Sequence, residues 1–230
     1  PKVYGKFYKI TDRRTLMYKA VMQSNTMMSA KLLDTINEYK PDAIIMCHPF
    51  VTTMISKLRR QHKIDVKAIS LITDYDAHRT YIVPYVDAYV LAEPDMATKL
   101  IDEYGVDESI IYPLGIPIFD RFTEPFDKKA ICEREGLDPN KPTILLMAGS
   151  FGVTSVLSFY KALAQRASEM QFIVITGRNI KLFANLEKLV EETGMQDNTK
   201  LLYFVKNVED YMHISDLIVT KPGGLTVTES

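Results

Sequence analysis

The C-terminal end of the sequence reads Asp216-Leu-Ile-Val-Thr-Lys-Pro-Gly-Gly-Leu-Thr-Val-Thr-Glu-Ser230. Its first five residues have the pattern of a short buried strand, Pro222-Gly223-Gly224 is typical of a tight turn, and a helix is expected to open at Thr226. This arrangement presents free backbone N–H groups to a phosphate, and glycine lets a ligand approach the backbone. Glu229, one turn into the helix, is suited to accept both hydroxyls of a ribose. The segment predicts a nucleotide site, with an ordinary strand-to-helix connection as the alternative.

The alternation of strand and helix continues through the rest of the chain. Strands are expected at 43–48, 67–72, 87–91, 110–114, 143–147, 171–176, 200–205 and 216–220. Helices are expected at 29–39, 51–62, 95–104, 127–136, 153–168, 180–193 and 207–213. This order predicts an α/β fold with parallel sheets covered on both faces. The charged, proline-bearing segment 119–142 marks the expected domain boundary, which gives one domain over 1–118 and a second over 119–230.

Glycine or polar residues follow the strands of the second half, where open α/β sheets bind ligands. Gly149 and Gly152 lie in a second strand-to-helix turn, which lacks the spacing of a dinucleotide site and the lysine of a P-loop. Combined with Gly223 and Gly224, this turn would supply a second helix N-terminus for a diphosphate. Arg178 follows another strand and is either a phosphate or base ligand or simply solvated.

Three polar residues of the first half are the candidates for acid–base chemistry. His48 lies at a strand end, and Asp74 and His78 are four residues apart. If the segment is helical, the Asp74 carboxylate shares a face with the His78 imidazole and orients it for general-base work. The alternative is a helix cap and a surface histidine. The four scattered histidines have no metal-ligand spacing, so we expect no catalytic metal.

Charge and cysteine content narrow the classes of partner and compartment. The 28 basic and 29 acidic residues give a net charge of −1, which provides no general electrostatic attraction to nucleic acid. Residues 1–31 hold seven Lys or Arg against Asp12 alone, with many aromatics. They are expected to pack on the domain as a helical hairpin, to contact an anionic membrane, or to do both through opposite faces. Cys47, in an apolar run, and Cys132 indicate buried, reduced thiols in the cytosol. No apolar run approaches the roughly 20 residues that span a bilayer.

Three motifs together resemble a known family. Lys221-Pro-Gly-Gly-Leu-Thr-Val-Thr-Glu229, Thr73-Asp74-x-x-x-His78 and Gly115-Ile-Pro117-Ile118 resemble the diacylglycerol glycosyltransferases. These include bacterial processive diacylglycerol β-glucosyltransferases and monogalactosyldiacylglycerol synthases, and they are related to the lipid II-forming N-acetylglucosaminyltransferase. The resemblance covers nearly the whole chain. It implies a GT-B fold, in which two Rossmann-like domains face a cleft, and an inverting hexose transfer that needs neither metal nor cofactor.

The resemblance also implies roles for single residues. Glu229 would hold the ribose hydroxyls, and the phosphates would be held by Gly223, Gly224 and Thr226. The loop over the cleft would contain Gly149 and Gly152. The backbone around Phe204 and Val205 would contact the uracil, with Arg178 nearby. The acceptor side would be lined by His48, Asp74 and His78. His78 is the base candidate within this sequence, and a histidine in the family's N-terminal glycine-rich loop, which this sequence lacks, is its rival.

We therefore expect a chain truncated at both ends and inactive by itself, from an enzyme that moves a hexose from a UDP-sugar to diacylglycerol. The enzyme is expected at the cytoplasmic face of the membrane as a peripheral protein, with the first domain on the acceptor side and the second binding the nucleotide sugar. Two alternatives are a GT-B enzyme similar to UDP-sugar epimerases and a non-catalytic subunit that binds a nucleotide sugar.

Overall fold

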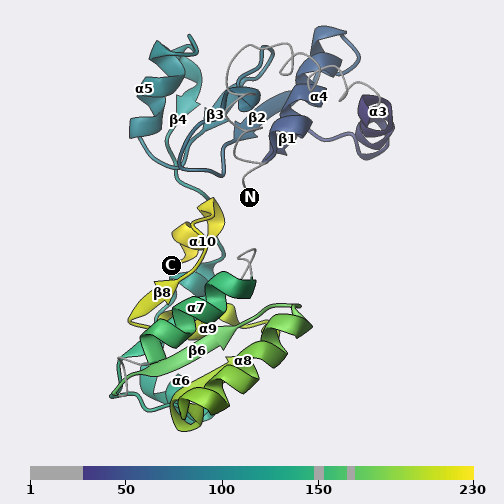
Figure 1. Cartoon of the computed structure of the whole chain (residues 1–230). Helices are drawn as coiled ribbons and strands as arrows, with labels where there is room; N and C mark the ends of the chain where they lie inside the picture. Colours follow the sequence, from purple (N-terminus) through teal and green to yellow (C-terminus); the bar gives the residue numbers. More distant parts are fainter. Residues whose placement is uncertain (1–27, 148–152, 165–168) are drawn as a thin grey trace. The chain divides into compact units, whose positions relative to one another are not determined.

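The chain forms two compact α/β units, each with its own parallel sheet. The computed structural model describes residues 28–147, 153–164 and 169–230 (Figure 1). The units are Pro1–Pro117 and Ile118–Ser230, whereas the sequence placed the boundary after residue 118. No helix of the described ranges is long and apolar enough to cross a membrane.

The sheet of the first unit has four strands in the order β1–β2–β3–β4. They are β1 (Ala43–Met46), β2 (Lys67–Leu71), β3 (Ala88–Val90) and β4 (Ile111–Tyr112). The connections hold α4 (Pro49–Arg60), η1 (Arg79–Tyr81), α5 (Asp95–Asp102) and η2 (Glu108–Ile110), and α3 (Met28–Tyr39) precedes β1. One core group joins α3, α4, β1 and β2, and it contains Ile36, Met46, Ile55, Leu58 and Ala68. A second group joins β3 to α5 and contains Tyr89, Leu91, Met96 and Leu100.

The sheet of the second unit has the order β7–β6–β5–β8, again all parallel. Its strands are β5 (Thr143–Met147), β6 (Gln171–Ile175), β7 (Thr199–Leu202) and β8 (Leu217–Val219). The helices are α6 (Lys128–Glu135), α7 (Val153–Ala164), α8 (Ile180–Thr193), α9 (Val208–His213) and α10 (Gly224–Glu229), with η3 (Asp120–Phe122) and η4 (Gln196–Asn198) as short 3₁₀ turns.

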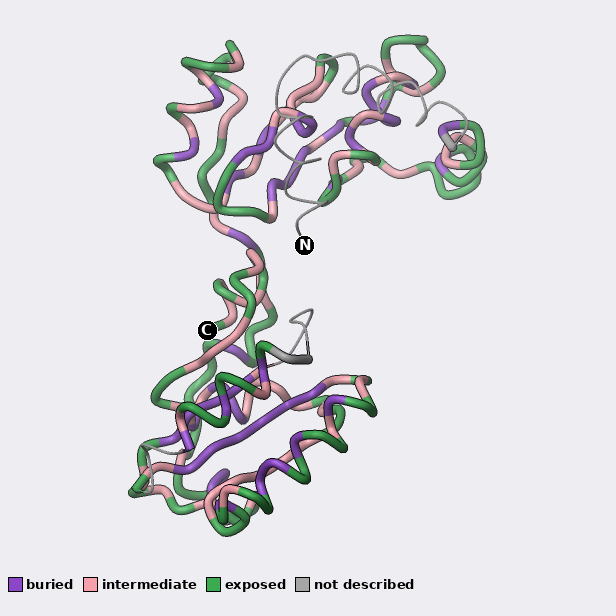
Figure 2. The backbone as a smooth tube through the Cα atoms, in the orientation of Figure 1, coloured by how far each residue is buried: buried purple, intermediate pink, exposed green. Residues whose placement is uncertain are grey.

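Alternation along β5 and β6 divides the second core between the two faces of the sheet. Ile144, Leu146, Phe172 and Val174 pack with α7 and α8. The intervening side chains, Leu145, Ile173 and Ile175, pack with α6 and α9 on the other face. Figure 2 accordingly shows β6 buried along its whole length. The prediction of an α/β fold with parallel sheets is confirmed.

Two details of the first unit differ from the expectation. β1 ends at Met46 rather than at residue 48. α4 begins at Pro49 rather than at residue 51, because proline is well suited to the first helical position. Cys47 therefore lies in the connection and is exposed, so the prediction that its thiol is buried was wrong. Cys132, in α6, is buried as predicted.

Candidate functional site

The carboxyl ends of the parallel strands lie at one edge of each sheet, and the predicted site residues follow these ends. In the second unit the described segments at this edge are 176–179 after β6, 203–207 after β7 and 220–223 after β8. Open α/β sheets bind ligands along this edge. Gly149 and Gly152, after β5, lie outside the described residues.

The turn after β8 leads into α10 through Gly223, which is the N-cap residue. Gly223 has φ −89° and ψ 146°, a conformation open to any residue, and a Cβ placed on it would meet nothing within 4 Å. The chain's own backbone therefore does not require glycine there. The first turn of a helix has N–H groups without intrahelical acceptors, and Gly223 offers them no side chain. The turn leaves backbone donors open to a ligand.

Glu229 is half-buried at the end of α10, which begins at Gly224 rather than at Thr226. Burial raises the pKa of the Glu229 carboxyl, the Arg121 guanidinium acts in the opposite direction, and the Glu209 carboxylate adds to the rise. Arg121 and Glu209 were not among the predicted site residues. Arg121 lies in a segment interpreted as a domain boundary, and no local pattern connects it to Glu229.

An aromatic residue and an arginine lie together after β6 and β7. The Arg178 guanidinium lies 5.0 Å from the centre of the Phe204 ring, and Phe204 is 51% exposed. The predicted strand 200–205 ends already at Leu202, so Val205 is a loop residue rather than the strand end. The described residues give the backbone N–H and C=O of Val205 no hydrogen-bond partner. These groups can pair with the edge of a base.

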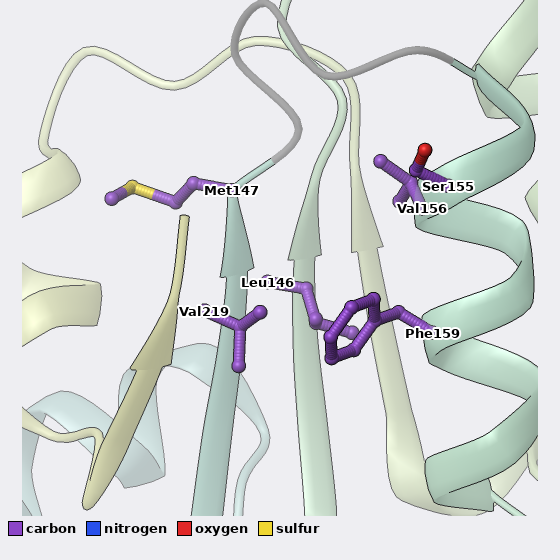
Figure 3. A pocket seen from close by; sticks show the side chains of 6 residues that line it. All are labelled: Leu146, Met147, Ser155, Val156, Phe159 and Val219. Carbon is purple, nitrogen blue, oxygen red and sulfur yellow. The ribbon is translucent and has the colours of Figure 1, made fainter. Parts of the chain in front are cut away.

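An apolar pocket of about 220 Å³ opens between the ends of β5 and β8 and the helix α7 (Figure 3). It is lined by Leu146, Met147, Ser155, Val156, Phe159 and Val219. Among the described residues that line it, Ser155 alone contributes a polar side-chain group. A sugar or a diphosphate needs several polar partners, and the described lining offers few.

In the first unit, the two predicted catalytic histidines are helix N-caps. His48 Nδ1 accepts a hydrogen bond from Phe50 N–H at 3.3 Å, at the start of α4. His78 is 4% exposed, and its Nδ1 accepts from Thr80 N–H at 3.2 Å at the start of η1. A backbone N–H can only donate, so the accepting Nδ1 carries no proton, and the proton of the neutral ring is on Nε2. The exposed His48 ring then presents an N–H donor at Nε2, whereas the buried His78 ring is also in contact with Thr80 Oγ1, 2.6 Å from its Nδ1.

The expected pairing of Asp74 with His78 is not present. The segment 73–78 is not helical, which removes the shared face on which that prediction depended. Asp74 is exposed and forms no hydrogen bond or ion pair with the described residues. In this loop it is the Asp76 carboxylate that has a partner, because it accepts a hydrogen bond from Lys99 Nζ at 2.7 Å. Sequence reasoning missed this pair because its members come from segments far apart in the chain.

Further predictions concern residues outside the described ranges. Residues 1–27, which carry most of the basic and aromatic N-terminal segment, are among them, so the choice between a packed hairpin and a membrane-contacting surface stays open.

Within the described ranges, no three His, Cys, Asp or Glu side chains are grouped as metal ligands would be.

Comparison with known proteins gives matches over both units. A family model described as monogalactosyldiacylglycerol (MGDG) synthase matches residues 2–118, and one described as glycosyltransferase family 28 C-terminal domain matches residues 143–230. A processive diacylglycerol beta-glucosyltransferase from Staphylococcus carnosus is 34% identical over 201 residues, which are 87% of this chain and 50% of that protein. The chain thus spans about half the length of the curated relatives it matches.

Solved structures show the same fold at low identity. A glycosyltransferase from Rickettsia africae is similar with a TM-score of 0.57 and 16% identity, covering 90% of this chain and 59% of that one. A UDP-GlcNAc 2-epimerase from Neisseria meningitidis, bound to UDP-GlcNAc, is similar with a TM-score of 0.57 and 14% identity, covering 89% and 60%. These neighbours confirm the predicted GT-B fold.

The family match is in agreement with the motifs of the sequence. The MGDG synthase model covers just over half of the 230 residues. It includes the segment with Thr73, Asp74 and His78, and the glycosyltransferase model includes Lys221–Glu229. The chain therefore belongs to the monogalactosyldiacylglycerol synthase family.

Proposed function

We propose that the protein transfers a hexose from a UDP-sugar to diacylglycerol and so makes a glycolipid. The observation that carries this proposal is the likeness to a diacylglycerol glucosyltransferase over 87% of the chain, which extends through both units. The fold by itself does not choose the reaction, because a UDP-GlcNAc 2-epimerase shares it. The donor edge of the second unit supplies the chemistry that a UDP-sugar requires.

The nucleoside of the donor binds after β7 and along α10 in this proposal. The exposed Phe204 ring and the Arg178 guanidinium lie at the edge that receives the uracil, and the backbone groups of Val205 pair with the base. The Glu229 carboxylate accepts the two ribose hydroxyls. Its partial burial supports this role, because a hydrogen bond to a carboxylate is stronger where water is partly excluded.

The diphosphate binds to backbone N–H groups. Gly223, Gly224 and Thr226 supply donors from the start of α10, and Gly149 and Gly152, which follow β5 outside the described residues, are proposed to supply others. Donors fixed in advance stabilise the charge that develops on UDP as it leaves, which is the role that metal ions have in other transferases. We therefore propose a transfer that needs no metal.

The acceptor lipid belongs to the first unit. A base removes the proton of the diacylglycerol hydroxyl, the oxygen attacks the anomeric carbon in line, and the bond to UDP breaks with inversion. The capping bond orients His48 as an Nε2–H donor, which suits it to hold the hydroxyl oxygen, and His78 caps η1 in the same unit. Asp74 is exposed in the loop that leads from β2 to His78, so its carboxylate is accessible from solvent. The general base is assigned to the rest of the full-length protein, as the family's glycine-rich loop implies.

The membrane supplies this acceptor, so we propose peripheral contact with its cytoplasmic face through the basic residues of 1–31. Net attraction to anionic lipid amounts to about 1 kcal/mol for each Lys or Arg near the surface. A sedimentation assay with anionic and neutral vesicles measures this contact directly. Binding that does not depend on anionic lipid would contradict the membrane part of the proposal.

Product formation tests the transferase proposal. The full-length protein is incubated with vesicles containing diacylglycerol and with radiolabelled UDP-glucose, UDP-galactose or UDP-GlcNAc. The expected result is label in the lipid phase with one of the hexose donors and release of UDP. A change of the sugar without lipid would indicate an epimerase, and binding of the donor with neither reaction would indicate a non-catalytic subunit. Either result would contradict the proposal.

A further inference from the structure

Two polar contacts join the end of α5 to the loop that follows β2. Lys99 Nζ donates a hydrogen bond to Asp76 Oδ1 at 2.7 Å. Tyr104, two residues beyond the end of α5, donates from its hydroxyl to the carbonyl oxygen of Ala77 at 3.3 Å. The loop is therefore fastened to α5 at two consecutive residues, directly before His78.

The Tyr104 ring adds a second set of contacts to the same place. The Arg79 guanidinium carbon lies 5.0 Å from the centre of this ring, and Lys99 Nζ lies 5.8 Å from it. A cation within about 6 Å of a ring centre is attracted by the face of the ring. One ring thus restrains both the cation that pairs with Asp76 and the first residue of η1.

Burial divides the loop into an anchored part and an exposed part. Ala77 and His78 are buried, and Ala77 belongs to the core group that also contains Met96 and Leu100 of α5. Residues 74–76 are exposed at the carboxyl edge of the first sheet. The exposed part, which a ligand can reach, therefore depends for its position on contacts that come from α5.

The pair of Lys99 and Asp76 lies largely in water. The Lys99 side chain is 25% exposed and the Asp76 side chain is 66% exposed. Solvent screens an ion pair of this kind, so it contributes little to the free energy of unfolding. What its short hydrogen bond can fix is the place of the loop.

We infer that Lys99 is a positioning residue for the acceptor, because through Asp76 it holds the loop 73–78 where its exposed residues meet the glycerol end of diacylglycerol. This inference rests on the proposed function, which assigns the acceptor to the first unit. Groups that hold a substrate act only when they are accurately placed. The donor is assigned to the second unit, so the loss of the Lys99 ammonium should weaken the acceptor and leave the donor unaffected.

Steady-state kinetics of the full-length protein test the inference, with diacylglycerol in vesicles and whichever UDP-hexose supports transfer. Lys99→Met removes the ammonium and keeps a long apolar side chain. Its KM for diacylglycerol should rise at least about threefold, while kcat at saturating lipid changes by less than about twofold, the pattern of a lost binding contact. The Kd for the same UDP-hexose, measured by calorimetry, should stay within about 1.5-fold of the wild-type value.

Further variants separate positioning from a general effect on the fold. Asp76→Ala should raise the KM for diacylglycerol as Lys99→Met does, and the double variant should have no larger effect than either, because both lose one interaction. Lys99→Arg should restore the wild-type KM. Lys129→Met removes an exposed ion pair with Glu133 from α6 and should leave the KM unchanged. Both methionine variants should melt within about 3 °C of the wild type.

The results distinguish the two proposals. If the wild type makes no glycolipid with any UDP-hexose, the proposed function fails, and the inference falls with it. If glycolipid forms but the KM of Lys99→Met for diacylglycerol equals that of the wild type, the inference alone is overturned. It is also overturned if donor and acceptor weaken equally, or if the effects of Lys99→Met and Asp76→Ala add. Should Lys99→Met fail to fold, the exposed change Asp76→Ala decides.

Discussion

The sequence predicted acid–base chemistry for His48 and His78, because histidine is a common acid and base. The structure shows that each of them also caps the start of a helical segment. Each accepts a backbone N–H bond at the start of a helical segment. For the segment with Asp74 and His78, the alternative prediction was a helix cap and a surface histidine, whereas His78 is buried and is itself the cap. What decides is the distance between Nδ1 and a backbone nitrogen, which depends on the side-chain rotamer and therefore on packing.

Substitution of His48 separates its two tasks. His48→Ala should lower the free energy of unfolding by about 0.5–1 kcal/mol, because the first turn of α4 loses its cap, and His48→Asn should restore it. His48→Asn should nevertheless lower the transfer rate, because the asparagine side chain does not reproduce the Nε2–H donor. Urea unfolding and product formation measure the two effects.

His62 provides the control for this substitution. It is exposed and has φ 53°, a conformation that asparagine tolerates, so His62→Asn should leave both stability and transfer unchanged. A His48→Asn protein that transfers hexose at the wild-type rate would remove His48 from the acceptor site.

Pairs of residues from distant segments were beyond the reach of sequence reasoning. Asp76 and Lys99, or Arg121 and Glu209, show no pattern of spacing, because their separation reflects the fold and not the period of a helix or strand. Cys47 illustrates a related limit. An apolar neighbourhood predicted burial, but the strand ends at Met46, two residues earlier than predicted, and leaves the thiol in a connection.

At the scale of elements, the sequence predicted almost the whole order of strands and helices. The apolar runs of β5 and β6 and their alternating contacts account for this, because a strand covered on both faces needs apolar side chains at every position. The ends of some helices differ from the prediction by a few residues, where a residue at the helix start determines the end. Pro49 and Gly224 extend their helices toward the N-terminus relative to the prediction.

The Asp87 carboxylate fastens α4 to the first sheet. It accepts hydrogen bonds from Arg59 at 2.6 Å and from Ala68 N–H at 2.7 Å, and Lys67 Nζ lies 3.7 Å away. Burial alone would raise the pKa of Asp87, but the hydrogen bonds from Ala68 and Arg59 and the charges of Arg59 and Lys67 outweigh it and hold the pKa below the ordinary 3.8. The ionised form is therefore the one that stabilises the fold.

Removing this charge should destabilise the protein in a pH-dependent way. Asp87→Asn should lower the free energy of unfolding by about 1–3 kcal/mol at neutral pH, because Arg59 loses its charged partner. Because the pKa of Asp87 is lower in the folded than in the unfolded protein, the ionised carboxylate stabilises the fold at pH values above the unfolded pKa of 3.8. This contribution is lost as the pH falls through the lower folded pKa.

The difference between wild type and Asp87→Asn should thus be constant from neutral pH to about pH 5 and shrink below 3.8. Urea unfolding followed by circular dichroism at several pH values measures it. Asp34→Asn, an exposed change in the middle of α3, is the matched control and should have no such profile. A difference that stays constant into acid would show that the charge of Asp87 is not the cause.

At the scale of the whole molecule, the GT-B fold and the family followed from a few motifs, because Lys221–Glu229 combines a turn, a helix start and a carboxylate within the segment that the glycosyltransferase family model matches. The motif did not reveal the charges that act on the Glu229 carboxyl. These come from η3 and α9, which carry no signature of their own. The turn, the helix start and the carboxylate were thus predictable from the sequence, whereas the charges that act on this carboxylate required the structure.

The affinity of the full-length protein for UDP-glucose, measured by calorimetry at about pH 8 with Glu229→Gln, tests the central claim that the second unit binds the donor through this carboxylate. Loss of two charge-assisted hydrogen bonds from ribose should weaken binding by about tenfold or more. Glu187→Gln, an exposed change on α8, should bind as the wild type does. Equal affinity of the Glu229→Gln and wild-type proteins would contradict the account.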